Sequence, residues 1–111
     1  MSNITVTKLK FNEVSALESG VDASNGAKIS FSGCDDSRMV LIIENKGSAA
    51  ATVTVKAGNG IQGVNDLTMT VNAGSVNALT VESGKYMAVS GEESGYVTVS
   101  GAVNVTAVLL P

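Results

Sequence analysis

The sequence predicts an all-β protein: a single-domain antiparallel β-sandwich of about eight or nine strands, jelly-roll or immunoglobulin-like. Three observations carry this prediction. Val and Thr recur throughout the 111 residues, and their branched side chains suit a pleated sheet better than a helix. Short runs of alternating apolar and polar residues start about every 10 to 12 residues. Glycine-bearing turns separate these runs, and a chain of this length forms one domain, residues 1–111.

The first expected strand covers residues 4–11. Its apolar parity changes between Val6 and Leu9, as happens at a bulge or where two registers overlap. Residues 12–27 mix charged residues, Gly and Asn, and are expected to form a long loop with at most one short helix. A second strand is expected at 28–32.

The strongest strand candidate is residues 38–45, whose continuous apolar centre predicts a central strand covered on both sides. Turn residues follow it, and residues 51–56 then alternate cleanly, with Val53 and Val55 facing inward. These two strands are expected to pair antiparallel. Further strands are expected at 67–71, 76–82, 85–90, 96–100 and 103–110.

Composition excludes several classes of function. The net charge is −3 and the seven cations are scattered, which argues against a nucleic-acid partner. The absence of His removes the commonest general base and metal ligand, so we expect no enzyme, metal or cofactor. Cys34 is the only cysteine, so no internal disulfide forms, as suits a protein made in the cytoplasm. No apolar run is long enough for a signal peptide or a membrane span, and no membrane partner is expected.

Four motifs that could carry chemistry are better explained structurally. The glycines of Gly58–Gly63 resemble a dinucleotide fingerprint, but strand-type sequence follows where a helix would be needed, so we expect a loop with positive-φ glycines. Asp35 and Asp36 supply too few oxygens for calcium and are expected to form a solvated turn. Glu92 and Glu93 are expected to point apart into water at a hairpin tip. Cys34 has no base to activate it and is expected to be a small, partly buried residue.

The remaining candidates are protein contacts. Residues 1–7 are uncharged, β-prone and free of Pro, so they suit either a first strand of the domain or an extended arm that adds a strand to a neighbour's sheet. The only two tyrosines each follow a glycine-bearing turn, and Tyr is enriched at interfaces. The predicted interface residues are Met1, Ser2, Asn3, Ile4, Thr5, Asn59, Ile61, Gln62, Tyr86 and Tyr96.

Several stretches resemble the small β-sandwich proteins of tailed-bacteriophage head modules, chiefly from Met39 onward and least over 13–36. They are Met39–Asn45, Val53–Gly63, Asp66-Leu67, Leu79, Glu82–Tyr86, Gly95–Val97 and the ending Ala107–Pro111. The resemblance implies a virion protein that decorates the capsid. It would be made in the bacterial cytoplasm, bind the outside of the major capsid protein lattice as a homotrimer, and reside on the head surface.

Two other functions fit the same composition. A tail or fibre-associated domain of the virion would share the fold and the lack of chemistry. A carbohydrate-binding or adhesive surface module would also be all-β, although sugar binders usually expose aromatic faces and aromatics make up only 4% of this chain.

Overall fold

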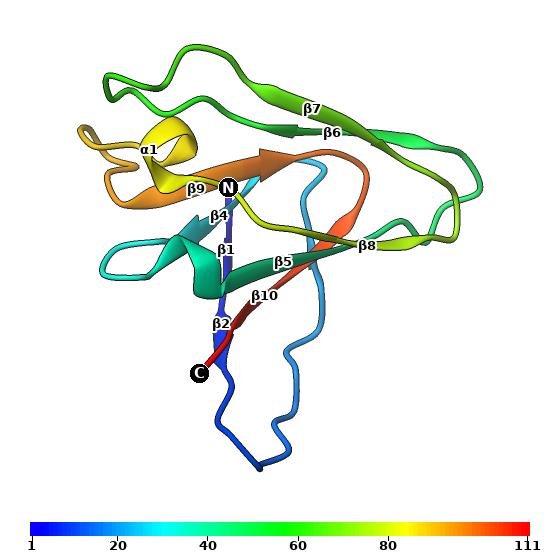
Figure 1. Cartoon of the computed structure of the whole chain (residues 1–111). Helices are drawn as coiled ribbons and strands as arrows, with labels where there is room; N and C mark the ends of the chain where they lie inside the picture. The colour runs from blue at the N-terminus through cyan, green and yellow to red at the C-terminus, as the bar shows by residue number, and fades with distance from the viewer.

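The computed structural model describes residues 1–111, and its strands form two mixed sheets with little helix. The first sheet has the order β1 (Ser2–Ile4), β4 (Ala27–Ser30), β9 (Tyr96–Ser100), β6 (Ala51–Val55) and β7 (Leu67–Val71). The second has the order β2 (Val6–Lys8), β10 (Asn104–Leu109), β5 (Met39–Glu44) and β8 (Val76–Leu79), with β3 (Val21–Asp22) also beside β10. A 3-10 turn, η1 (Asp36–Arg38), and one helical turn, α1 (Ser83–Tyr86), complete the chain (Figure 1).

One hydrophobic core contains residues from strands of both sheets. Alternate residues of each strand point into it, so Val53 of β6 and Val97 of β9 meet Leu41 of β5 and Val105 of β10, all fully buried. Phe31 is the only buried aromatic residue. The core is therefore filled mainly by branched aliphatic side chains, as the composition predicts, and the all-β prediction is confirmed at this level. No helix is long and apolar enough to cross a membrane.

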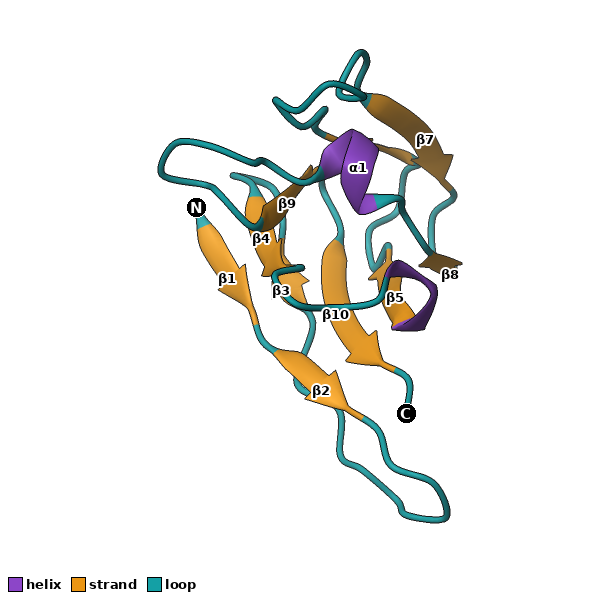
Figure 2. Cartoon of the chain, turned by 60° about the vertical axis from the view of Figure 1, so that its left-hand side comes forward, coloured by secondary structure: helices purple, strands orange, loops and turns teal.

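The first strand of the sequence is divided between the two sheets. β1 pairs with β4, and after Thr5 the chain continues as β2, which pairs with β10. The parity change between Val6 and Leu9 falls at the end of β2, where the chain leaves the second sheet. Both pairings are parallel, so the prediction of purely antiparallel sheets is wrong. Parallel neighbours need a long connection. The connection from β1 to β4 includes the long loop that follows β2 (Figure 2), and residues 9–103 connect β2 to β10.

The predicted hairpin of residues 38–45 and 51–56 is also wrong. β5 and β6 follow each other in sequence but belong to different sheets: β5 pairs with β10 and β8, whereas β6 pairs with β7 and β9. β5 is an interior strand, yet only the face with Met39, Leu41 and Ile43 is fully buried, and the other face is half-buried. The turn at Asn45 carries the chain across the core instead of folding it back.

The predicted strand at residues 85–90 is replaced by α1 and a loop. Asp36 accepts hydrogen bonds from the Ser83 backbone N–H (2.8 Å) and hydroxyl (3.0 Å), and so caps the start of α1 across the fold. Only Met87 forms a β-bridge, with Val97. Residues 12–27 contain no helical turn but include the short strand β3. A distant carboxylate therefore overrides the local strand preference.

Candidate contact surfaces

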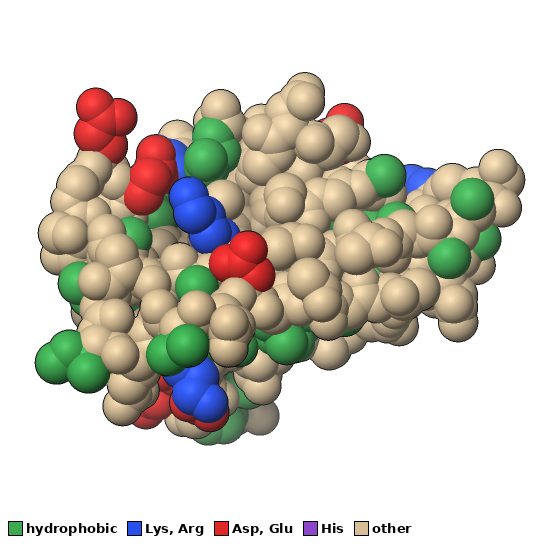
Figure 3. All heavy atoms as spheres, turned by 90° about the horizontal axis from the view of Figure 1, so that it is seen from above, with side chains coloured by type: hydrophobic (Ala, Val, Ile, Leu, Met, Phe, Trp, Pro, Cys, Tyr) green, Lys and Arg blue, Asp and Glu red, His purple; other side chains and the backbone are tan.

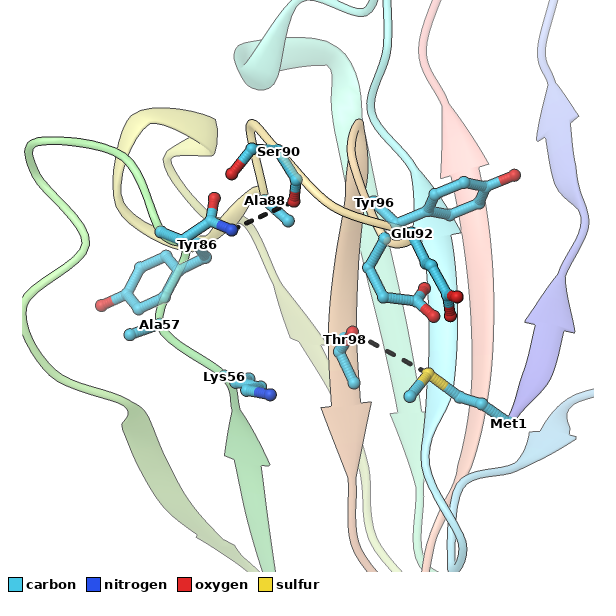
Figure 4. Close-up of a pocket in the computed structure, with 11 residues that line it drawn as sticks. Met1, Lys56, Ala57, Tyr86, Ala88, Ser90, Glu92, Tyr96 and Thr98 are labelled. Atoms are coloured by element: carbon cyan, nitrogen blue, oxygen red, sulfur yellow. Dashed lines mark hydrogen bonds between the residues drawn. The ribbon is translucent and has the colours of Figure 1, made fainter.

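A pocket of about 240 Å³ lies at one end of the first sheet, where the N-terminus, the loop after β6, α1 and β9 meet. Figure 4 places Tyr86 on one side of it and Tyr96 and Met1 on the other. We call it the tyrosine pocket, and it is lined by Met1, Lys56, Ala57, Asn59, Tyr86, Ala88, Ser90, Glu92, Glu93, Tyr96 and Thr98. The fold thus brings together Met1, Asn59, Tyr86 and Tyr96, four of the ten predicted interface residues, from four separate parts of the chain.

Asn59 of the loop after β6 forms two hydrogen bonds to the segment after α1, beside the tyrosine pocket. Its amide Nδ2 donates to the Ser90 carbonyl (3.1 Å), and its Oδ1 accepts from the Val89 backbone N–H (2.8 Å). Gly58 N–H also donates to the Lys85 carbonyl (2.9 Å). Both polar ends of the Asn59 amide are therefore used inside the protein, which makes this residue a structural part of the pocket wall.

The glycines of the Gly58–Gly63 loop serve close packing. None of them has positive φ, so the expectation of left-handed backbone here is wrong. A Cβ on Gly58 would lie 2.3 Å from the Met87 carbonyl oxygen, and one on Gly63 would lie 1.9 Å from the Gly58 carbonyl oxygen. These positions require glycine because the loop folds tightly on itself and against the segment after α1.

Charged side chains gather at the tyrosine pocket end of the molecule (Figure 3). Lys28 Nζ lies 3.1 Å from Glu93 Oε2 and 4.6 Å from the centre of the Tyr96 ring. The Oε2 atom is buried and accepts no hydrogen bond of good geometry, so the Lys28 ammonium is its only compensation. The Glu93 side chain is 38% exposed, so the expectation of a solvated carboxylate is wrong only for its Oε2 atom, whereas Glu92 is exposed.

The N-terminal edge adjoins the tyrosine pocket at Met1. Met1 is 64% exposed, and its sulfur accepts a long hydrogen bond from Thr98 Oγ1 (3.9 Å). Ser2 N–H donates to the Gly26 carbonyl (3.2 Å), so β1 begins by bonding to its neighbour in the first sheet. Alternate residues of a strand face opposite sides, so the backbone groups of Asn3 point to the open edge.

The other predicted interface residues lie in different surroundings. Ser2, Asn3 and Thr5 are exposed, but Ile4 is 6% exposed and belongs to the core. Ile61 is fully exposed, and Gln62 lines a second hollow that shares Tyr86 with the tyrosine pocket. The predicted residues therefore form one contiguous surface only around Met1, Asn59, Tyr86 and Tyr96.

Residues 9–20 form a long exposed loop, which overlaps the loop predicted over residues 12–27 but was not predicted as a contact surface. It projects beyond the sheets at the end opposite α1 (Figures 1 and 2) and carries Phe11, Val14 and Leu17, exposed by 77%, 102% and 51%. The spacing of Val14 and Leu17 is that of one face of a short helix, but the structure forms no helical turn there. Without a neighbouring element to cover them, they remain in water.

The carboxylates beside Cys34 have local structural roles. The Ser37 hydroxyl (2.8 Å) and backbone N–H (3.0 Å) both donate to Asp35 Oδ1. These two hydrogen bonds, with a smaller contribution from the positive charge of Arg38, hold the pKa of Asp35 below its usual value of 3.8, against a small opposing effect of burial. Asp36 caps α1, and Cys34 is half-buried against the core. No group of three or more acidic or cysteine side chains is placed to hold a metal ion.

Comparison with known proteins finds no family model, no curated protein and no solved structure that matches this chain.

Proposed function

We propose that this chain is a bacteriophage capsid decoration protein that binds the outer surface of the major capsid protein lattice and stabilises the head. We further propose that its two sheets pack as a β-sandwich of the jelly-roll or immunoglobulin-like type. Two lines of support combine: the resemblance to phage head proteins from Met39 onward, and the surface around the N-terminal edge.

The observation that carries the proposal is the open edge of β1. Residues 1–7 carry no charged side chain and no proline, the devices that usually protect an edge strand from pairing. β1 and β2 lie at the outer edges of the two sheets, so a capsid segment could add to the outward-facing backbone of Asn3. Exposed Ser2, Asn3 and Thr5 leave room for that segment.

The proposed mechanism is stabilisation of the assembled shell by selective binding. A module that binds the assembled lattice and not the free capsid subunit shifts the equilibrium toward the assembled shell. We propose a homotrimer, as the resemblance implies. Once one subunit of a trimer has bound the lattice, the other two are held near their sites at a high effective concentration, so the trimer binds more tightly than a single copy.

The test is co-sedimentation of the purified protein with capsids of the phage that encodes it. Asn3→Pro removes the outward N–H and should weaken capsid binding by about tenfold or more. The control Asn3→Thr changes the same side chain but keeps the N–H, and should bind like the unmodified chain. Circular dichroism of both variants should match that chain, because proline is tolerated at an open edge.

Two results would contradict the proposal. The unmodified protein could fail to sediment with its capsids, which would remove the proposed function. Electron microscopy with a labelled protein could place it on the tail, which would favour the tail or fibre assignment instead. If binding occurs but Asn3→Pro and Asn3→Thr bind equally well, capsid decoration stands and the edge-strand contact is wrong.

A further inference from the structure

One continuous segment closes an outer edge of both sheets. Residues 1–9, which we call the strap, contain β1 and β2 and run as a single extended segment along the side of the domain (Figure 2). β1 pairs only with β4, and β2 pairs only with β10. Loss of the strap would therefore uncover unpaired backbone groups on two sheets at once.

The strap is held by short pairings and little buried surface. Each of its strands pairs over three residues, and both pairings are parallel, which is slightly less stable per residue than antiparallel pairing. Ile4, at 6% exposed, is the only buried side chain of the strap. Segments with few buried apolar contacts open more easily than the core of a domain.

The strands beneath the strap keep other partners without it. β4 also pairs over four residues with β9, and β10 pairs over six residues with β5, both antiparallel. Ile29 of β4 and Val105 of β10 are fully buried in the core that these strands share. The domain can therefore release the strap and retain the pairing of its remaining strands.

The loop that follows the strap gives it slack. Residues 10–20 form no backbone hydrogen bond and no ion pair. The far end of this loop is anchored, because the Ala23 N–H donates to the Val103 carbonyl (2.9 Å) and a Cβ on Gly20 would lie only 2.8 Å from the Asn104 Cβ. The loop can therefore absorb a movement of the strap while β3 stays in place.

We propose that the strap opens and recloses as one unit while the rest of the domain stays folded. The closed strap covers the edge of β4 and the Ala107–Leu109 part of β10, and the open strap exposes both edges to a partner strand. This device belongs to the isolated protein and does not rest on capsid decoration.

The test is native-state hydrogen exchange of the full chain, followed residue by residue by NMR at a series of low urea concentrations. After correction for intrinsic rates, the hydrogen-bonded amides of β1, β2 and Leu9 should share one opening equilibrium. They should exchange at least about a hundredfold faster than amides of β5. Urea should hardly accelerate them, because opening exposes little surface, whereas it should accelerate β5 amides steeply.

Two substitutions separate local opening from global unfolding. Val71 is 1% exposed on β7, at the opposite edge of the first sheet, so Val71→Ala should speed up exchange of β5 amides by about tenfold or more and leave the strap unchanged. The matched variant Ile4→Val shortens the buried side chain of the strap itself. It should speed up exchange of the strap amides by about twofold to tenfold.

Two results would overturn the proposal. Strap amides could follow β5 amides in urea and in Val71→Ala, which would mean that the strap leaves only on global unfolding. Amides of β1 and β2 could instead show different opening equilibria, which would mean that the strap is not one unit. If Val71→Ala does not fold, the urea series on the unmodified chain decides between these results. Co-sedimentation with capsids tests the proposed function separately, and its outcome leaves the exchange result intact.

Discussion

The side-chain amide of Asn45 donates a hydrogen bond to the backbone carbonyl of Val71 over 3.0 Å, and this bond joins the two sheets. Asn45 follows β5 in the second sheet, and Val71 ends β7 in the first. The same Nδ2 donates to the Ala49 carbonyl (2.9 Å), while Oδ1 accepts from the Gly47 N–H (2.9 Å). Asn45 is 1% exposed, so the crossing of the chain between sheets depends on a fully satisfied buried amide.

We predict that Asn45→Ala lowers the free energy of unfolding by about 1 to 3 kcal/mol, because it leaves the buried Val71 carbonyl without its partner and removes the part-buried hydrogen bonds to Ala49 and Gly47. Urea denaturation followed by tyrosine fluorescence measures this loss. Asn77→Ala, at an exposed position of β8, is the control and should change the free energy of unfolding by less than about 0.5 kcal/mol. Equal effects of the two substitutions would contradict the structural role of Asn45.

We predict that Gly58→Ala destabilises the protein by about 1 to 3 kcal/mol, because the new methyl group would lie 2.3 Å from the Met87 carbonyl oxygen. The matched control is Gly60→Ala in the same loop, where the nearest atoms are Val89 side-chain methyls at 3.6 Å. Thermal unfolding should separate the two variants, and amide exchange should speed up in the segment after α1 only for Gly58→Ala. A tolerated Gly58→Ala would mean that the loop is not packed as described.

Acid should weaken the protein partly through its two Asp-Ser turns. The pKa of Asp35 is lowered by Ser37, and that of Asp22 by hydrogen bonds from the Ser24 hydroxyl and N–H. A carboxyl whose folded-state pKa is lower than its unfolded value stabilises the folded state above that unfolded value, and this contribution is lost as the pH falls through the folded-state pKa.

The double variant Asp22→Asn, Asp35→Asn keeps an acceptor oxygen at each turn but cannot titrate. We predict that its free energy of unfolding falls less steeply than that of the unmodified chain below about pH 4. Urea denaturation at a series of pH values measures the slope. Glu18→Gln, at an exposed loop residue that accepts no hydrogen bond in the structure, should leave the slope unchanged. Parallel slopes for the double variant and the unmodified chain would contradict this prediction.

Local pattern was sufficient for most of the strands, although not for residues 85–90 or for β3. β7 and β9 have the bounds that alternation predicts, and Val53 and Val55 face inward as expected. Alternation reports which side of a strand is buried, and that information lies within a few neighbouring residues. The same reasoning selected Met1, Asn59, Tyr86 and Tyr96 as contact candidates from residue type and position, without placing them together.

Pairing, by contrast, depends on residues far apart in the chain. Alternation in β5 and β6 does not say that Asn45 sends them to different sheets, and nothing local marks Thr5 as the point where the N-terminal strand changes neighbours. α1 exists where Asp36 meets Ser83, and Gly58 is needed because Met87 approaches it. These features arise from contacts between residues that are far apart in the sequence. Which residues meet is decided by the folding of the whole chain and not by the local pattern.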